Sequence, residues 1–449
     1  MAKEMDSVPE ITAITVAGFK SIARETRVEI APLTLLAGAN SSGKSSVMQP
    51  LLLLKQTLEA TYDPGALLLS DSHVRFTDAS QMLARKGRSQ VATFQVGIEA
   101  GAISVSESFS KSKAGNVTLD SMTVARGSDR VALHSEMSNQ ALREELGVGA
   151  GFSIERERCF LRIAPPAQGP ISMQGKEGSL WMTSAVMSTT VELGLRNIDL
   201  LLRSMIHLPG LRGNPQRNYP VTSRGPWFEG PFPVYTASVI LSWQEKNDIR
   251  LKLLSTQLQR LDLTWKVEAR QVDATRVELN VGRLRSPARG GARDLVNIAD
   301  VGFGVSQTLP VLVALLAAQP GQLVYLEEPE IHLHPAAQQA MAEILCDAAK
   351  RGVKVVAETH SDILLLAVQT LVSEGAMSPD LVKLHWFERG EDGTTTVTSA
   401  DLDEAGAYGP WPEDFGRVRA EGESRYLTAA EGHMFRDAPR GRKAKTARR

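Results

Sequence analysis

The chain has 449 residues, of which 43% are hydrophobic and 22% are charged. At roughly 150 residues per domain, this length predicts two or three domains, and the composition excludes a disordered or collagen-like chain. The 50 basic and 51 acidic residues give a formal charge of −1. Any contact with nucleic acid must therefore come from local patches, because there is no overall positive field.

Cysteine usage and hydropathy indicate the cellular setting. Only two cysteines occur, Cys159 and Cys346, which excludes a disulfide scaffold and a cysteine-based zinc site. No apolar stretch approaches the ~20 residues of a membrane helix. The first ten residues, MAKEMDSVPE, are polar and acidic, unlike a signal peptide. We expect a cytoplasmic protein that makes no membrane contact.

Apolar periodicity predicts two α/β blocks far apart in the chain. The first block has strands over 11–16, 27–30 and 33–37, then a glycine-rich turn and a helix over 44–59. The second has a helix over 307–318, a strand over 323–326, a helix over 336–350 and a strand over 353–357. Between them lie short alternating stretches, with helices over about 183–206 and 246–263.

Because each block is incomplete alone, we predict one catalytic domain split by an insertion. The predicted segments are the N-terminal half of the domain (1–90), an insertion of mixed strands and helices (91–285), the C-terminal half (286–415) and a basic tail (416–449). Residues 436–449 hold seven basic residues and one acidic residue without apolar periodicity, which is typical of a disordered segment.

The first motif is GANSSGKS at residues 38–45, which matches G-x-x-x-x-G-K-[ST] between a predicted strand and a predicted helix. Such a loop binds phosphates through backbone N–H groups that have no partner inside the helix. We expect Lys44 to reach the β- and γ-phosphates and the Ser45 hydroxyl to ligate Mg²⁺. The residues expected to contact ATP are Gly38, Asn40, Ser41, Ser42, Gly43, Lys44, Ser45 and Ser46.

Two further motifs follow predicted strands. The strand over 323–326 ends in Glu327 and Glu328, a Walker B pattern, and catalytic groups collect at this end of parallel strands. We expect Glu327 to hold Mg²⁺ and Glu328 to orient the water that attacks the γ-phosphate. His360 follows the next strand, where it can donate to the γ-phosphate and position the water.

Together these motifs resemble those of the ABC-type ATPases of the RecF/SMC/OLD branch. The matching segments are GFKS (18–21), GANSSGKSS (38–46), LEEPEIHLHP (326–335) and ETHSD (358–362). The similarity is closest to the OLD-like AAA-family ATPases of bacterial phage-defence systems. It implies an α/β fold, namely a P-loop ABC-ATPase head with a mixed sheet flanked by helices, here split by a β-rich and helical insertion.

The resemblance also implies a homodimer or higher homo-oligomer around ATP, in which each site combines the P-loop of one subunit with a signature helix of the other. The candidate signature is DVGFGVSQ at 300–307, in which Gly-x-Gly-x-Ser-Gln resembles the OLD-like version. We expect Ser306 to cap the following helix and, with Gly304, to face a phosphate held by the partner subunit. Helix capping without any nucleotide contact is the alternative.

Two further groups of residues, one acidic and one a pair of histidines, are of the types found in nuclease and metal sites. Full-length OLD proteins carry a TOPRIM nuclease domain, but Asp401 and Asp403 precede Glu421 here, the reverse of its order. We interpret these residues as surface loop, with a degenerate nuclease as the alternative. His332 and His334 have a spacing that allows metal ligation, but no third clustered ligand completes a zinc site.

Two basic features could contact DNA or RNA phosphates without sequence specificity. One is the tail, and the other is a Gly/Pro-rich loop that carries Arg283, Arg285, Arg289 and Arg293. Ordinary solvation, or a contact with nucleotide or a partner subunit, is the alternative for the loop.

The sequence therefore favours an ATPase that dimerises around ATP and controls a separately encoded effector, such as a nuclease in phage defence. Two alternatives remain open: an ATP-loaded scaffold with little turnover, and a RecF-like DNA-repair ATPase. Complete catalytic residues favour turnover over the scaffold.

Overall fold

The computed structural model describes residues 9–87, 89–113, 115–146, 152–164, 178–223, 225–284, 294–409 and 424–428, with the backbone alone for 145–146 and 178–190. The chain divides into two units, Met1–Gly409 and Pro410–Arg449. In the second unit the described residues, 424–428, form a short helix, and the rest of the predicted tail lies outside the described residues. None of the described helices is long and apolar enough to cross a membrane.

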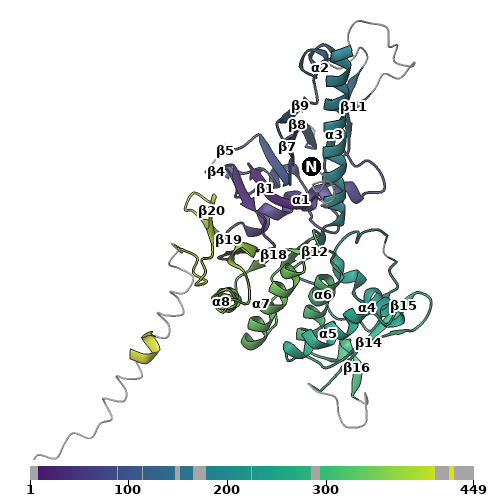
Figure 1. Ribbon diagram of the computed structural model, residues 1–449, viewed down its shortest axis with the longest axis vertical. Coiled ribbons are helices and arrows are strands. Elements are labelled where there is room, and N and C mark those ends of the chain that lie inside the picture. Colours follow the sequence, from purple (N-terminus) through teal and green to yellow (C-terminus); the bar gives the residue numbers. More distant parts are fainter. Residues whose placement is uncertain are drawn as a thin grey trace, which may run out of the picture. The chain divides into compact units, whose positions relative to one another are not determined.

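A six-stranded sheet carries the sequence motifs (Figure 1). Its strands, in order across the sheet, are β12 (Ile206–Leu208), β17 (Leu323–Glu327), β18 (Lys354–Thr359), β3 (Leu33–Gly38), β19 (Val382–Arg389) and β20 (Thr395–Asp401). All neighbouring pairs are parallel except β19 with β20. Because parallel strands end at one edge, β3, β17 and β18 bring the three motifs together.

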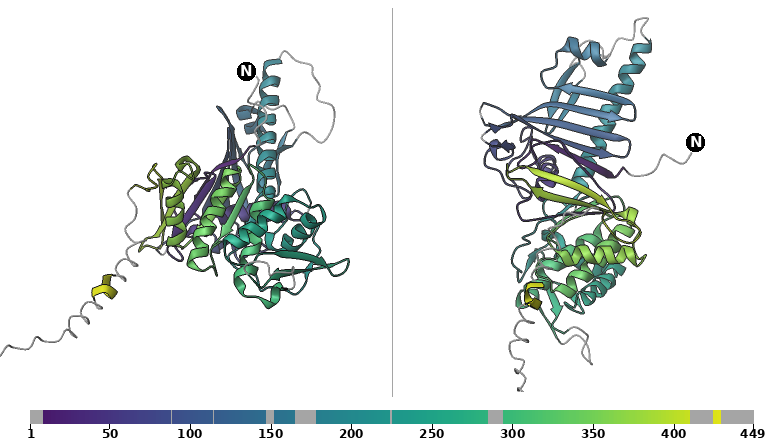
Figure 2. Two further views of the ribbon diagram at one scale, coloured as in Figure 1. Left: turned by 60° about the horizontal axis from the view of Figure 1, so that its bottom comes forward. Right: turned by 90° about the vertical axis from the view of Figure 1, so that its left-hand side faces the viewer.

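Helices α1 (Lys44–Glu59), α6 (Phe303–Ala317) and α7 (Pro335–Lys350) pack on this sheet, and α8 (Asp362–Ser373) packs on α7 (Figure 2, left). The helix α1 begins and ends at the predicted residues, and β17, α7 and β18 lie within two residues of their predicted bounds. The apolar periodicity of these elements therefore reflects real burial.

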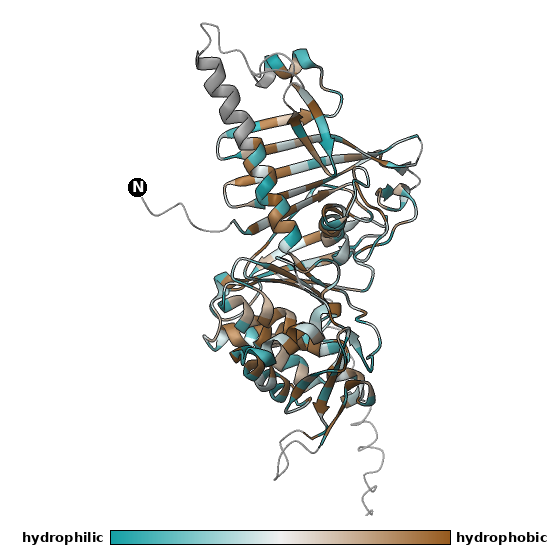
Figure 3. Ribbon diagram, turned by 90° about the vertical axis from the view of Figure 1, so that its right-hand side faces the viewer, coloured by the Kyte–Doolittle hydropathy of each residue, from teal (hydrophilic) through white to brown (hydrophobic). Residues whose placement is uncertain are grey.

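A second six-stranded sheet is antiparallel throughout. Its order is β2 (Thr26–Glu29), β1 (Ile11–Ala17), β6 (Thr93–Ala100), β7 (Ile103–Lys111), β8 (Val117–Arg126) and β9 (Asp129–His134). Hydrophobic and polar residues alternate along its strands (Figure 3), which is typical of a sheet with one buried face. Helix α3 (Gly178–Ser204) packs along β7, β8 and β9 (Figure 2, right).

Strand pairing crosses the predicted segment boundaries. The pair β1–β6 joins the predicted N-terminal half to the predicted insertion, and β12, from the insertion, pairs with β17. A smaller sheet packs against α4 (Thr236–Glu245), which in turn packs against α5 (Ile249–Arg260) and α6. Its strands are β13 (Tyr219–Pro220), β14 (Val267–Gln271), β15 (Arg276–Gly282) and β16 (Leu295–Asn297).

The remaining described elements are short. They are β4 (Arg85–Lys86), β5 (Ser89–Gln90), α2 (Asn139–Leu146), β10 (Ser153–Glu157), β11 (Phe160–Ala164) and four 3₁₀ turns (Ala79–Gln81, Phe232–Tyr235, Ile298–Asp300 and Pro379–Leu381).

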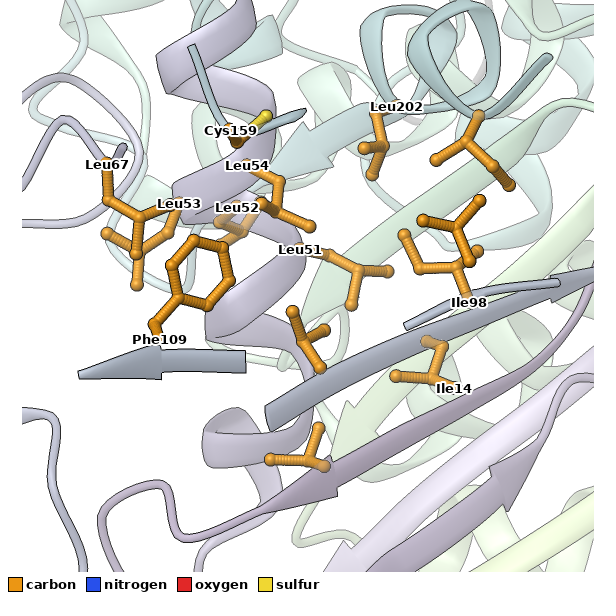
Figure 4. Close-up of a cluster of buried hydrophobic side chains, with 14 of the residues drawn as sticks. Ile14, Leu51, Leu52, Leu53, Leu54, Leu67, Ile98, Phe109, Cys159 and Leu202 are labelled. Atoms are coloured by element: carbon orange, nitrogen blue, oxygen red, sulfur yellow. The ribbon is translucent and has the colours of Figure 1, made fainter. Parts of the chain in front are cut away.

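Helix α1 contributes many side chains to a large apolar core (Figure 4). Its four consecutive leucines, 51–54, are each at most 1% exposed. Successive helical residues point in directions about 100° apart, so four buried in a row mean that the helix is covered on every side. Figure 4 shows these leucines beside Ile14, Ile98, Phe109 and Leu202. The helix that begins at the phosphate-binding motif is therefore held rigidly.

A buried polar chain runs from α1 to β17. On α1, the Lys55 Nζ lies 2.6 Å from one oxygen of Glu59, whose other oxygen lies 3.2 Å from the Nε2 of His73. The Nδ1 atoms of His73 and His207 lie 2.9 Å apart, and the Nε2 of His207 lies 3.2 Å from Glu327. Burial lowers the pKa of His73 to about 4 and also lowers the pKa of Lys55.

Replacing Lys55 by Met should lower the free energy of unfolding by about 3–5 kcal/mol, because it leaves the buried Glu59 carboxylate without its ammonium partner. The matched control is Lys111→Met, which breaks an ion pair with Asp78 whose side chains are 34% and 46% exposed. That control should cost less than about 1 kcal/mol. Urea denaturation of both variants measures the difference, and equal losses would show that the Lys55–Glu59 pair does not stabilise the core.

Candidate nucleotide-binding site

The loop between β3 and α1 turns sharply because three of its residues have positive φ. The values are 144° at Gly38, 60° at Ser41 and 104° at Gly43. A Cβ atom at Gly38 would overlap the carbonyl oxygen of Phe387, and one at Gly43 would overlap the hydroxyl of Thr395. Both positions therefore need glycine, for the backbone angle and for the close approach of β19 and β20.

The loop is braced from β19 and β20, which sequence reasoning did not connect to it. The Thr395 hydroxyl lies 2.7 Å from the Ser42 carbonyl oxygen and 2.7 Å from the Ser21 hydroxyl. The Arg389 guanidinium donates to the Ser41 carbonyl oxygen at 3.2 Å. The Oγ atom of Ser42 is buried without a hydrogen-bond partner. These contacts hold the loop through residues outside α1.

Lys44 reaches back over the loop. Its Nζ donates to the carbonyl oxygens of Gly38 at 3.1 Å and Ala39 at 2.9 Å, and it lies 3.4 Å from the Nδ1 of His360. Burial lowers the pKa of Lys44, while the nearby carboxylate of Glu358 opposes that shift. The structure thus brings two predicted residues, Lys44 and His360, into contact from distant parts of the chain.

An open pocket of about 890 Å³ lies over this loop. It is lined by Asn40, Ser41, Gly43, Lys44, Ser45 and Ser46 of the motif, by Glu328, Glu358 and His360 from the neighbouring strand ends, and by Lys20, Gln49, Arg85 and Arg389 at its periphery. Four of these side chains, Lys20, Lys44, Arg85 and Arg389, are cationic. A polyphosphate fits such a surface because cations and free backbone N–H groups stabilise its negative charge.

Glu328 and His360 lie together in the lining of the pocket. The Nε2 of His360 lies 3.4 Å from the Glu328 carboxylate. Glu328 has a positive φ of 46°, and its N–H donates to the carbonyl oxygen of Glu358 at 3.0 Å, which anchors the turn to β18. Burial, together with the charge of Lys44, lowers the pKa of His360. Buried Glu330 accepts hydrogen bonds from Thr359 Oγ1 at 2.5 Å and from the His360 N–H at 3.1 Å.

The carboxylate beside Ser45 is that of Glu358. Ser45 Oγ donates to Glu358 Oε2 at 2.8 Å, and the hydroxyl of buried Tyr325 donates to Oε1. Burial raises the pKa of Glu358 to about 7, although the hydrogen bonds from Tyr325 and Ser45 favour its ionised form. From the sequence, Glu358 was noted only as the first residue of the ETHSD motif, with no role of its own. A carboxylate directly after the buried run 355–357 was the signal that could have identified it.

Glu327, at the end of β17, makes its contacts on the β12 side of that strand, whereas Glu358 contacts Ser45. The Oε1 of Glu327 is 3.2 Å from His207 Nε2, and its Oε2 accepts from the Gly210 N–H at 2.9 Å. Burial disfavours ionisation of Glu327, but the hydrogen bonds from His207 and the Gly210 N–H, with the nearby charge of Arg212, together lower its pKa. The assignment of Glu327 as a Mg²⁺ ligand stays a prediction, and Glu327 does not line the pocket.

Arg212 joins the Walker B turn to the signature helix. Its guanidinium donates to the carbonyl oxygens of Glu327 at 2.6 Å, Glu328 at 3.2 Å and Gln307 at 3.3 Å. Burial lowers the pKa of Arg212 to about 10. This role was not predicted from the sequence, because no local pattern shows that Arg212 contacts the backbone of Glu327 and Glu328, more than a hundred positions away.

The signature helix starts earlier than the sequence predicts. Helix α6 begins at Phe303 with Gly302 as its N-cap, and Ser306 lies within the first turns, where its hydroxyl donates to the Phe303 carbonyl oxygen at 3.1 Å. The expectation that Ser306 caps this helix is therefore wrong. The almost continuous burial of α6 from Val305 onward extends the helix past the predicted start. Gly304 and Ser306 are largely covered, whereas Gly302 and Phe303 are exposed.

The other predicted residues have diverse positions. His334 caps α7 through its Nδ1, which accepts from the Ala336 N–H at 3.4 Å, and the His332 ring lies 5.9 Å from that of Phe303. Arg283 is exposed after β15. Arg285, Arg289 and Arg293 lie outside the described residues, so the nucleic-acid contact stays a prediction.

Gly38→Ala should lower the free energy of unfolding by about 2 kcal/mol or more, because the methyl group adds an overlap with Phe387 to the strain of positive φ. Gly65→Ala is the matched control, since Gly65 has a φ of 99° but no atom within 4 Å of its Cβ position. It should cost only the backbone strain, about 1 kcal/mol. Urea midpoints compare the two, and an equal effect would contradict the close approach of β19.

With this geometry established, three comparisons relate the chain to known proteins. Residues 266–367 match a family model described as an AAA domain, putative AbiEii toxin, type IV TA system. This segment spans α6, β17, α7 and β18. A search of curated proteins found no significant match.

Solved structures similar to the chain include an SMC head bound to the C-terminal winged-helix domain of ScpA, with 13% identity, coverage of 88% of this chain and 99% of that chain, and a TM-score of 0.51. Another is the SMC head domain with an extended coiled coil, bound to the C-terminal domain of ScpA, from Pyrococcus furiosus (11% identity, 88% and 96% coverage, TM-score 0.47). At this identity the similarity shows the fold alone. The chain has the α/β fold of a P-loop ABC-ATPase head, as the sequence predicts.

Proposed function

We propose that this protein is an ATPase that binds ATP with Mg²⁺ in the pocket over the β3–α1 loop. The observation that carries the proposal is that Lys44, Glu328 and His360, from three separate segments, line one open pocket of about 890 Å³. The family match to an AAA domain and the head fold support it.

Each group in the pocket has a role in this proposal. The backbone N–H groups of the loop and the N-terminus of α1 receive the phosphates, because they have no partner within the helix. Lys44 Nζ moves from the loop carbonyl oxygens to the phosphates. Glu328, whose side chain is 38% exposed, orients the attacking water, and His360 beside it donates to the γ-phosphate. Mg²⁺ supplies charge neutralisation at the phosphates, and the Ser45 hydroxyl is suited to hold it because Mg²⁺ prefers oxygen ligands.

We propose that two heads form the complete site. The N-terminal end of α6 exposes Gly302 and Phe303, and a helix N-terminus stabilises a phosphate that approaches it. Gly304 and Ser306 would then support this contact from within the first turn.

The SMC head of the comparison is bound to a domain of ScpA. For this chain we propose a separately encoded effector, such as a nuclease in bacterial phage defence; the family description as a putative toxin supports a defence setting.

Lys44→Ala should abolish ATP binding, because the variant lacks the ammonium group that faces the phosphates. Glu328→Gln should bind ATP with little change but hydrolyse it at least about 100-fold more slowly, as expected when a group that orients water is removed. Isothermal titration and phosphate release measure these effects, and size exclusion with ATP and Mg²⁺ tests whether Glu328→Gln accumulates as a dimer.

Glu343→Gln is the control, because Glu343 lies on α7 near Arg260, away from the pocket. Full hydrolysis by Glu328→Gln would contradict the catalytic assignment. Binding without turnover by the unmodified chain would favour an ATP-loaded scaffold, and stimulation by DNA would favour a RecF-like repair function.

A further inference from the structure

Two glutamates end adjacent parallel strands in register. Glu327 of β17 is paired with Glu358 of β18, so both side chains project from the same face of the sheet. Each is a candidate for the acidic Mg²⁺ ligand of the proposed site. Their surroundings differ, and that difference distinguishes them.

Both carboxylate oxygens of Glu327 already have partners, the Nε2 of buried His207 and the N–H of partly buried Gly210. His207 contacts His73, which contacts Glu59 on α1. The side chains of His73 and His207 are at most 1% exposed. If Glu327 turned towards Ser45, the buried Nε2 of His207 would lose its carboxylate partner, and unpaired buried groups are strongly unfavourable.

Glu358 faces the phosphate-binding loop instead. Its Oε2 accepts from Ser45 at 2.8 Å, its Oε1 accepts from Tyr325, and Glu358 and Ser45 both line the pocket. A hydroxyl and a carboxylate side by side supply the hard oxygen ligands that Mg²⁺ prefers, with phosphates and water completing its shell. A buried carboxylate next to a pocket also gains from a cation there, because the cation offsets the unfavourable burial of its charge.

We propose that Ser45 and Glu358 hold the Mg²⁺ that accompanies the nucleotide, and that Glu327 is a structural member of the buried chain Lys55–Glu59–His73–His207–Glu327. This inference rests on the proposed function. It moves the acidic metal ligand from the Walker B strand to the neighbouring strand β18, which ends just before His360.

The test uses the full chain with a non-hydrolysable ATP analogue, AMP-PNP, and Mn²⁺ as a spectroscopic substitute for Mg²⁺. Electron paramagnetic resonance measures the Mn²⁺ affinity of the nucleotide complex, and AMP-PNP binding in EDTA measures the affinity without metal. Glu358→Gln should weaken Mn²⁺ binding more than about tenfold, since even indirect partners of a metal ligand contribute that much. Its metal-free AMP-PNP affinity should stay within about twofold of the unmodified chain.

Glu327→Gln is the matched comparison, since it makes the same change one strand away. It should keep Mn²⁺ affinity within about threefold but lower the urea midpoint, and adding His207→Gln should lower the midpoint by less than the two separate effects combined. If Glu327→Gln loses Mn²⁺ while Glu358→Gln keeps it, or if both lose it equally while folded, the inference is overturned and the nucleotide site stands. If the unmodified chain binds no AMP-PNP, the proposed function fails and the inference fails with it.

Discussion

The burial of most of helix α1 is the constraint on which the site depends. Its leucines are covered on every side, and its Lys55 and Glu59 begin a polar chain that ends on β17 at Glu327. A helix fixed by both apolar packing and buried polar contacts cannot shift without leaving charged groups unpaired. The loop at its N-terminus therefore presents its N–H groups in one place, as a site for a polyanion requires.

Parallel pairing supplies the rest of the site. Because β18 lies between β17 and β3, the acidic turn after β17 and the histidine after β18 end beside the loop after β3. Glu330 then fixes this edge by accepting from Thr359 and from the His360 N–H. Arg212, from a segment outside both α/β blocks, ties the turn at Glu328 to the signature helix. The segment between the blocks thus contributes directly to the head.

The sequence predicted the elements whose signals are local. The helix over 44–59 and the strand that ends at Glu327 were placed correctly, because burial on all sides or on both faces leaves long apolar runs. The start of α6 was wrong, because Ser306 has the side chain of a good N-cap while packing of the apolar helix against its neighbours extends it back to Phe303. Local capping preference is small compared with the burial of a whole helical turn.

By itself, the sequence determined the phosphate-binding loop, the acidic strand end and the histidine, since each is a short motif with its own flanking pattern. Only the tertiary structure decided which carboxylate meets Ser45, which residues brace the loop from β19 and β20, and that His73 and His207 join α1 to Glu327. Most of these contacts connect residues more than a hundred positions apart, and neighbouring glutamates look equivalent in a sequence. Strand order and the partners available on each side of the sheet make them different.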